Sequence, residues 1–255
     1  MLLLVDNSNR TTKLALTGPE QPCIDALCRI PSDTLSPATI TAVLPAGITI
    51  DAILWASVTA TGPAILDAYA RSLGVPGRGL DGTNAPLDLR GCPEPHAIGP
   101  DRLANALAAN ARAAGRPAIA IDAGTAITFN VVDPGSPFPV FRGGAIAPGL
   151  AVFSNWLQAH TARLPEIPFP MPRNVPPAIG TTTVAAMSAA AWHGAAGMLR
   201  GILDAQCAGL GTEASIFLTG TDAPVVAAML APRGIEVVPP LTLDGLRLAA
   251  AFLLD

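Results

Sequence analysis

Short runs of apolar residues, each followed by a polar turn, recur along the chain and predict buried strands. The first run covers residues 2–5 and ends at Asp6; after the polar segment NSNRTT, the residues KLALT predict a returning strand. Further strands are predicted at residues 52–58, 118–122, 125–132 and 215–218. The strands therefore form two blocks, and each block begins with a strand that ends in an acidic turn.

Segments whose apolar residues have helical spacing alternate with these strands. Residues 102–114 are rich in good helix formers, and Asp101 is well placed before them as an N-cap or first-turn acid. Helices are also predicted at residues 181–203 and 223–230, and an extended surface loop is predicted at the proline-rich residues 165–177. The order is typical of a duplicated α/β fold with a cleft between two similar halves, at about residues 1–115 and 116–255. The final helix could return to the first half.

Composition favours a large buried core and argues against two classes of partner. Hydrophobic residues make up 50% of the chain and charged residues 13%, and the net charge of −4 without basic clusters argues against nucleic-acid binding. Mean hydropathy is +0.45, yet the most apolar stretch, 184–203, is alanine-rich and includes His193 and Arg200, so it predicts a buried helix and no membrane span. The cysteines form no CxxC pair or metal cluster with the histidines, which favours reduced thiols and a cytoplasmic location.

The basic residues are 14 arginines and a single lysine, Lys13. A Walker-type phosphate loop needs its lysine in a glycine-rich run before Ser or Thr, whereas Lys13 lies in RTTKLA. This placement excludes a P-loop nucleotide enzyme. Schiff-base chemistry would likewise have only this one candidate lysine.

Two acidic turns are candidate phosphate sites, Asp6-Asn7-Ser8-Asn9 and Asp122-Ala123-Gly124-Thr125. Such a turn can place a metal-binding carboxylate beside backbone N–H groups that bind phosphate. Asp and Asn are also ordinary turn residues, so each turn alone is weak evidence. Two such turns facing one cleft are a stronger indication.

Two further segments carry candidate chemistry. In the segment GPDRLAN, Asp101 could act as a general base while Arg102 holds an anionic group of the substrate; the alternative is a helix cap with a surface ion pair. The glycine-rich segment GGAIAPG at 143–149 allows a close backbone approach to a ligand, but a tight turn alone would also explain it.

In order and spacing, the segments DNSNRTTK, GPDRLAN, DAGTAITFN, GGAIAPG, HTARLP and GTTTVAAM resemble the type III pantothenate kinases, also called the Bvg accessory factor family. The resemblance covers roughly residues 1–220. It implies two similar halves of the acetate and sugar kinase, heat-shock chaperone ATPase and actin type with a central cleft. It also implies a homodimer that uses ATP, Mg²⁺ and a monovalent cation (K⁺ or NH₄⁺) to phosphorylate pantothenate in the first step towards coenzyme A.

The resemblance also implies roles for individual residues. The nucleotide-phosphate loop would be Asp6, Asn7, Ser8, Asn9, Arg10, Thr11, Thr12 and Lys13, with Asp6 near the metal. The pantothenate site would be Gly99, Pro100, Asp101 and Arg102, with Asp101 as the base. Asp122 would bind the monovalent cation and Thr125 would contact ATP. Thr183 would contact pantothenate across the dimer interface on a helix of the second half, or cap that helix.

Departures from the family pattern leave other functions open. Ser8 replaces the glycine of the first motif and Arg10 replaces its hydroxyl residue, while Asn130 replaces the Asp that usually ends the second. Cys92 stands where an aromatic is common, and the late Thr-Gly-Gly is Thr219-Gly220-Thr221. These changes allow a second hypothesis, a catalytically impaired relative that binds a ligand or acts as a regulator. A third hypothesis is a kinase of the same superfamily that acts on another small hydroxy acid.

Overall fold

The computed structural model describes residues 1–18, 21, 27–169 and 175–254, and the chain divides into two compact units. Unit 1 comprises Met1–Ala118, Val132–Gly143 and Pro239–Asp255; unit 2 comprises Ile119–Val131 and Gly144–Val238. Neither unit is continuous in sequence, in contrast to the halves 1–115 and 116–255 predicted from the strand blocks. The end of a hairpin and the final helix belong to unit 1, because their packing partners lie there.

Unit 1 is built on a five-stranded sheet of order β3-β2-β1-β4-β5. Its strands are β1 (Leu2–Asn7), β2 (Thr11–Thr17), β3 (Cys28–Pro31), β4 (Ala52–Ser57) and β5 (Gly77–Gly79). Strand β1 runs antiparallel to β2 and parallel to β4, and all its residues are buried, which explains its continuous apolar sequence. The carboxyl ends of β1 and β4 meet where Asn7 pairs with Ser57.

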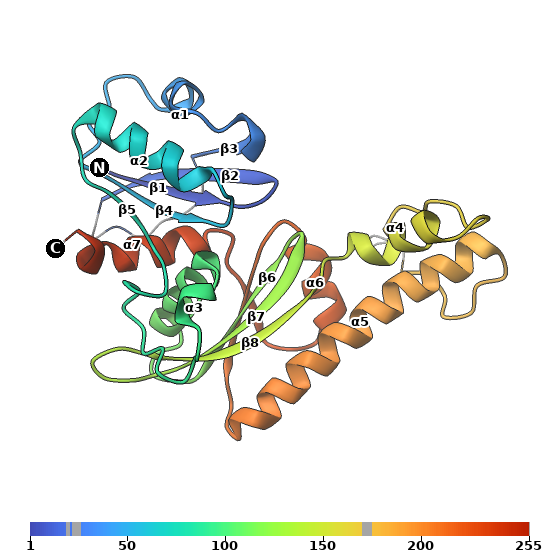
Figure 1. Ribbon diagram of the computed structural model, residues 1–255. Helices are drawn as coiled ribbons and strands as arrows, with labels where there is room; N and C mark the ends of the chain where they lie inside the picture. Colours follow the sequence, from blue (N-terminus) through green and yellow to red (C-terminus); the bar gives the residue numbers. More distant parts are fainter. Residues whose placement is uncertain (19–20, 22–26, 170–174, 255) are drawn as a thin grey trace. The chain divides into compact units, whose positions relative to one another are not determined.

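Helices cover both faces of this sheet (Figure 1). Helices α1 (Pro37–Val43) and α2 (Gly62–Leu73) lie on one face, and α3 (Pro100–Arg112) and α7 (Leu241–Leu253) lie on the other. Helix α7 contacts α3, β1 and β4, which places the C-terminal segment within unit 1. Two short 3-10 helices, η1 (Ser32–Thr34) and η2 (Pro95–Ala97), belong to the connections.

Unit 2 repeats the strand order of unit 1. Its sheet has the order β10-β9-β6-β7-β8. The strands are β6 (Ala118–Ala123), β7 (Ala126–Asp133), β8 (Val140–Pro148), β9 (Ser215–Thr219) and β10 (Ile235–Val237). In both sheets the first strand of the block is central, the next two strands lie on one side of it and the later two on the other. This repetition confirms the predicted duplicated α/β fold.

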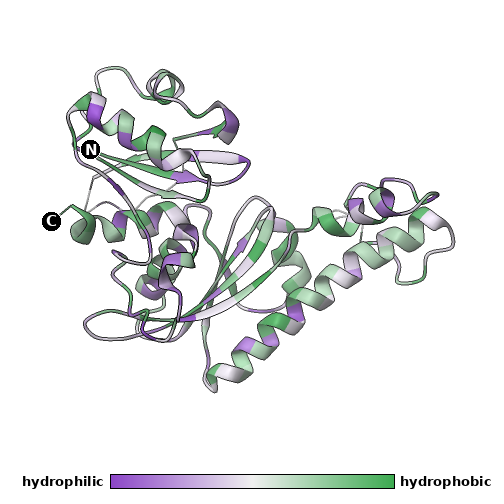
Figure 2. Cartoon of the chain, in the orientation of Figure 1, coloured by the Kyte–Doolittle hydropathy of each residue, from purple (hydrophilic) through white to green (hydrophobic). Residues whose placement is uncertain are grey.

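A long helix, α5 (Thr183–Leu210), dominates the rest of unit 2 and is apolar over most of its length (Figure 2). Its 28 residues correspond to a length of about 42 Å. Its C-terminal half packs on α6 (Ala223–Leu230) and on the sheet through Leu199 and Leu203. Its N-terminal half packs on α4 (Ala151–His160). Among the described residues, no helix combines the length and apolar character that crossing a membrane requires.

Most elements predicted from the sequence are confirmed within one or two residues, and two helices differ for clear reasons. The helix predicted from residue 102 begins at Pro100, because proline fits the first helical turn, where no N–H partner is needed. The helix predicted to end at residue 203 continues to Leu210, where Gly211 adopts the left-handed conformation that ends a helix. Of the predicted loop 165–177, the described parts 165–169 and 175–177 contain no helix or strand, and 170–174 lie outside the described residues.

Candidate active site

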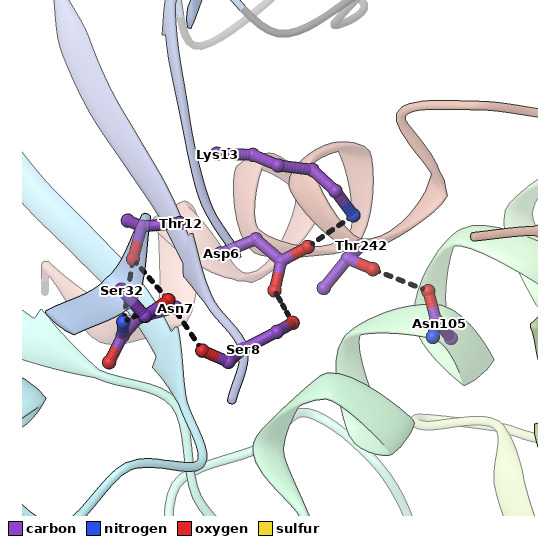
Figure 3. A network of polar contacts seen from close by, with 8 residues as sticks. All are labelled: Asp6, Asn7, Ser8, Thr12, Lys13, Ser32, Asn105 and Thr242. Atoms are coloured by element: carbon purple, nitrogen blue, oxygen red, sulfur yellow. Dashed lines mark hydrogen bonds and ion pairs between the residues drawn. The ribbon is translucent and has the colours of Figure 1, made fainter. Parts of the chain in front are cut away.

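The first acidic turn places a buried carboxylate opposite the lysine. Asp6 lies near the end of β1, is only 2% exposed, and is paired in register with Lys13 on β2. Lys13 Nζ donates to Asp6 Oδ2 at 2.8 Å, and the Ser8 hydroxyl donates to Asp6 Oδ1 at 3.1 Å (Figure 3). Both oxygens of the Asp6 carboxylate are therefore held, one by Ser8 of the turn and one by Lys13 of β2.

The neighbouring residue, Asn7, holds the strand ends together beneath this turn. Its amide nitrogen donates to Thr12 Oγ1 at 2.7 Å and, at 3.4 Å, to Ser32 Oγ. Its amide oxygen accepts from Ser57 Oγ at 2.7 Å and from Thr59 Oγ1 at 2.6 Å. We call these five residues the Asn7 cluster. Because Asn7 is 1% exposed and its amide bonds to four protein groups, its side chain supports the turn.

The tip of the turn is also held from outside by η1. The Ser32 hydroxyl donates to the Ser8 carbonyl at 2.6 Å, and the Ser32 backbone N–H donates to the Arg10 carbonyl at 3.0 Å. Within the turn, the Ser8 N–H donates to the Thr11 carbonyl at 3.2 Å. Asn9 and Arg10 are exposed at the tip. The predicted phosphate loop is thus a preformed turn whose tip faces outward.

The predicted substrate segment begins helix α3. Gly99 is the N-cap residue, and Asp101 lies in the first turn. Of the two positions predicted for Asp101, N-cap or first-turn acid, the second is therefore confirmed. Asp101 Oδ1 accepts from the Arg102 N–H at 2.9 Å. A Cβ at Gly99 would lie 2.5 Å from the same oxygen, so a larger residue there would displace the Asp101 carboxylate. Glycine at this position is therefore explained by the carboxylate beside it.

Asp6 and Asp101 lie close enough in unit 1 to interact electrostatically. Burial raises the pKa of the Asp101 carboxyl above its ordinary value, and the charge of Asp6 raises it further. The N–H and the positive charge of Arg102 act in the opposite direction. The first acidic turn and the substrate segment, which are far apart in sequence, therefore form one acidic site.

Arg102 lies against the wall of this site. Its guanidinium carbon is 5.7 Å from the centroid of the Phe141 ring. Burial lowers the pKa of the Arg102 guanidinium, while the nearby Asp101 and Cys92 oppose that change. An arginine stays protonated in proteins, so a partly desolvated positive charge stands beside Asp101.

The last residue of the substrate segment has a structural role. Asn105 is 1% exposed, and its Oδ1 accepts from the hydroxyl of Thr242 on α7 at 3.0 Å (Figure 3). On the same pair of helices, a Cβ at Gly245 would lie 1.9 Å from the Ala104 carbonyl. This glycine allows α7 to approach α3 closely. The C-terminal helix thereby holds α3, and with it Asp101.

In unit 2 the second acidic turn is the meeting point of three motifs. Gly149, the last residue of GGAIAPG, donates its N–H to the Thr125 carbonyl at 3.2 Å. Asp222, which follows Thr219-Gly220-Thr221, donates its N–H to the Ala123 carbonyl at 2.9 Å. Gly220 has a φ of +100° and a Cβ there would lie 2.2 Å from the same carbonyl, so only glycine fits. Segments separated by about 100 residues in sequence therefore surround residues 122–125.

Comparison with known proteins agrees with this arrangement. The sequence model of the family described as type III pantothenate kinase matches residues 2–205. A type III pantothenate kinase of Akkermansia muciniphila is 37% identical over 262 aligned residues, which cover 97% of each chain. Another, from Acidiphilium cryptum, is 40% identical over 61% of this chain and 56% of its own.

The chain belongs to the type III pantothenate kinase family.

Solved structures confirm the fold of this family member. A Baf-family protein of Campylobacter jejuni superposes with a TM-score of 0.62 at 16% identity, covering 98% of this chain and 97% of its own. A ROK-family glucokinase of Streptomyces griseus superposes with a TM-score of 0.51 at 11% identity, covering 98% of this chain and 97% of its own. The sugar-kinase type of fold predicted from the sequence is thus confirmed.

In this pantothenate kinase, two of the departures from the family pattern fit without strain. Ser8 replaces glycine in an ordinary backbone conformation, since among the described non-glycine residues only Ala114 has a positive φ. Asn130 is fully buried, and its amide nitrogen donates to Thr128 Oγ1 at 3.1 Å and to the Ala120 carbonyl at 3.4 Å. A carboxylate at position 130 would face that carbonyl without a proton to donate. The amide is therefore the matching group for this position.

The helix that carries Thr183 is capped by its neighbour. The Thr182 hydroxyl accepts from the Ala185 N–H at 3.2 Å, so Thr182 is the N-cap of α5. The alternative in which Thr183 caps the helix is wrong, because Thr183 is the first helical residue and is exposed. A close approach of Gly180 to Ala186 brings the preceding loop back over the first turn.

Sequence reasoning missed the residues that support the site from a distance. Ser32, Ser57 and Thr59 of the Asn7 cluster lie in separate segments without a motif, and only the fold brings them to Asn7. Phe141 was missed for the same reason. The only signal in the sequence was its position two residues before the glycine pair 143–144.

Proposed function

We propose that this protein transfers the γ-phosphoryl group of ATP to the primary hydroxyl of pantothenate, giving 4′-phosphopantothenate, the first step of coenzyme A biosynthesis. Membership of the type III pantothenate kinase family supports the reaction. The observation that carries the assignment of the site is the Asp101 carboxylate at the start of α3, which accepts from the Arg102 N–H and lies near enough to Asp6 for the two charges to interact.

Asp101 is the general base of the proposed reaction. A carboxylate whose pKa is raised by burial accepts a proton more readily than an ordinary one. Asp101 would take the proton of the pantothenate hydroxyl as that oxygen attacks the γ-phosphorus. Arg102 would bind the carboxylate of pantothenate, which suits the planar, bidentate donor set of a guanidinium. Gly99 and Pro100 would shape the backbone around the acceptor.

Each acidic turn is a candidate contact for the nucleotide. In unit 1, the exposed tip residues Asn9 and Arg10 would offer backbone N–H groups to phosphate, and Lys13 would supply an ammonium group near the β- and γ-phosphates. In unit 2, Thr125 would contact ATP. Asp122 would bind a monovalent cation, K⁺ or NH₄⁺, beside it. Phosphoryl transfer requires mainly positioning and neutralisation of charge, so no covalent intermediate is needed.

A divalent cation fits the donor set of unit 1. Asp6 and Asp101 bring two carboxylates close enough for their charges to interact, and carboxylate oxygens are the ligands that Mg²⁺ prefers. Asp6 would hold the ion, which when bound would neutralise charge on the transferred phosphoryl group. Within the described ranges, no group of three or more His, Cys, Asp or Glu residues could hold a metal ion. The remaining ligands would therefore come from ATP and water.

A homodimer would complete the acceptor site. Apolar side chains are exposed on α4 and around the start of α5, including Trp156 at 53%, Ile179 at 84% and Val184 at 49%. Exposed apolar residues clustered on one part of a fold are typical of an interface. Thr183 lies among them and would reach pantothenate bound to the partner subunit. Sedimentation velocity would test the dimer. A cytoplasmic location agrees with the free thiols of Cys28, Cys92 and Cys207.

The experiment is an assay of the purified protein with ATP, Mg²⁺, pantothenate and either K⁺ or NH₄⁺, with product identified by mass spectrometry. We expect 4′-phosphopantothenate, and we expect Asp101→Asn to lower kcat on the order of 10²-fold or more while pantothenate binding persists. Asp67→Asn, which changes an acid of the same unit in an exposed ion pair with Arg71, is the matched control. Product from glucose, or no product from any acceptor, would contradict the proposed function. An unchanged kcat in Asp101→Asn would contradict the role of Asp101 alone.

A further inference from the structure

The segment Val132–Gly143 brings an aromatic ring to the acceptor arginine. This segment is the end of the β7–β8 hairpin and belongs to unit 1. It is fixed there by Asp88, whose N–H donates to the Pro139 carbonyl at 2.8 Å and whose carbonyl accepts from the Phe141 N–H at 3.1 Å. Phe141 is 1% exposed, so its ring has one defined position.

One contact of its ring and one of its backbone link Phe141 to the candidate substrate site. The Arg102 guanidinium carbon lies 5.7 Å from the ring centroid, which is within the range of a cation–π interaction. The thiol of Cys92 donates to the Phe141 carbonyl oxygen at 3.8 Å. Phe141 and the loop that carries Cys92 therefore form one wall beside Arg102.

A ring in this position favours one orientation of a flexible side chain. Arginine has many rotamers, and a guanidinium that rests on an aromatic face keeps its N–H edges available in its own plane. Those edges are the groups that bind a carboxylate in bidentate fashion. The contact with Phe141 therefore orients Arg102 through the face of its guanidinium and not through its N–H groups.

We propose that Phe141 is a positioning residue that holds the Arg102 guanidinium in the orientation that binds the carboxylate of the acceptor. This inference rests on the proposed function, because it takes Arg102 to be an acceptor-binding residue. Phe141 would then join the residues that determine acceptor affinity, although no sequence motif identifies it, and the end of the β7–β8 hairpin would have a role in acceptor binding.

The test compares variants that keep or remove the ring. Phe141→Leu keeps an apolar side chain without an aromatic face, Phe141→Tyr keeps the face, and Phe138→Leu removes another ring of the same segment, one that contacts Phe252. We expect Phe141→Leu to raise the KM and Kd for pantothenate about tenfold, within the roughly 2- to 30-fold range of a cation–π contact, with kcat and the KM for ATP changed less than about twofold. Phe141→Tyr is expected to restore the affinity, and Phe138→Leu to leave it near that of the parent.

A double-mutant cycle separates this role from general packing. In an Arg102→Ala background, Phe141→Leu should no longer change pantothenate affinity, because the two residues act together. An equal loss of affinity in both backgrounds, or equal damage from Phe141→Tyr and Phe141→Leu, would overturn the positioning role. The side-chain Nε–H resonance of Arg102, identified by its loss in Arg102→Lys, should lose its ring-current shift in Phe141→Leu.

The two proposals fail in different ways. An active parent enzyme in which Phe141→Leu leaves both the affinity and the Arg102 resonance unchanged would overturn the positioning role and leave the proposed function standing. A parent that yields no 4′-phosphopantothenate would overturn the proposed function, and the positioning role with it, even if the Arg102 resonance still reports the ring.

Discussion

Lys13 and Asp6 form an ion pair of 2.8 Å across neighbouring strands at the base of the first acidic turn. The register of β1 and β2 places the two residues directly opposite each other. Their side chains are only 17% and 3% exposed, so each charge depends on the other for stabilisation. The single lysine of the chain is thus positioned by the same strand pair that forms the candidate phosphate loop.

Replacing Lys13 by methionine should destabilise the protein and weaken nucleotide binding. The Asp6 charge would stay buried without its cation, which we expect to cost about 3 kcal/mol and lower the midpoint of thermal unfolding by roughly 6–12 °C. Loss of one charge-assisted contact should raise the KM for ATP about tenfold. The control is Arg71→Met, which breaks an exposed pair with Asp67 and should cost less than about 1 kcal/mol. Equal losses of stability in the two variants would show that the buried Lys13–Asp6 pair stabilises the protein no more than an exposed ion pair does.

The Asn7 cluster should be far more sensitive than the tip of the same turn. Asn7→Ala removes a buried amide that bonds four side-chain hydroxyls, so we expect a loss of about 2–4 kcal/mol. Asn9→Ala changes an exposed amide two residues away and should stay within about 0.5 kcal/mol. Thermal unfolding of both variants measures the difference. If Asn9→Ala were the more damaging, the tip would be the structural part of the turn.

Asp101→Asn should stabilise the folded protein while it removes activity. Burial raises the pKa of Asp101 in the folded state, so the protonated carboxyl is favoured there. The stabilisation that comes from the protonated Asp101 carboxyl is fully present below about pH 4, the pKa of an aspartate in an unfolded chain. It is lost as the pH rises through the higher pKa that Asp101 has in the folded state. The ionised carboxylate is therefore unfavourable at neutral pH, and the amide is not. We expect Asp101→Asn to unfold at a higher temperature than the parent at pH 8, with the gap shrinking towards pH 4. A gap that widened towards acid pH would contradict the direction of the pKa shift.

Restoring the family residues in the first turn should change nucleotide use little. Ser8 has no backbone strain and donates to Asp6, while Arg10 is exposed at the tip. We therefore expect the double change Ser8→Gly with Arg10→Thr to alter the KM for ATP by less than about threefold, which corresponds to under about 1 kcal/mol. Steady-state kinetics with varied ATP would measure it. An improvement of more than tenfold would show that these two residues impair the loop.

Local sequence was sufficient wherever a segment's structure depends on its own pattern. The buried strand β1 has a continuous apolar run, and α6 matches its predicted bounds, because burial and helical periodicity are visible in consecutive residues. Helix ends were less visible. Pro100 and Gly211 set the ends of α3 and α5 through backbone conformation, which no count of apolar residues reveals.

Apolar periodicity and ordered motifs are properties of the chain alone, and they were sufficient to predict the duplicated α/β fold, the family, and candidate roles for Asp6, Asp101 and Asp122. Which distant residues meet is visible only in the folded structure. It paired Lys13 with Asp6, placed Phe141 beside Arg102, and joined the C-terminal helix to α3. Such contacts depend on strand register and helix packing across many residues of intervening chain. The pattern of residues along the chain does not reveal these contacts, because each side chain has many chemically equivalent candidate partners until the packing of the core is known.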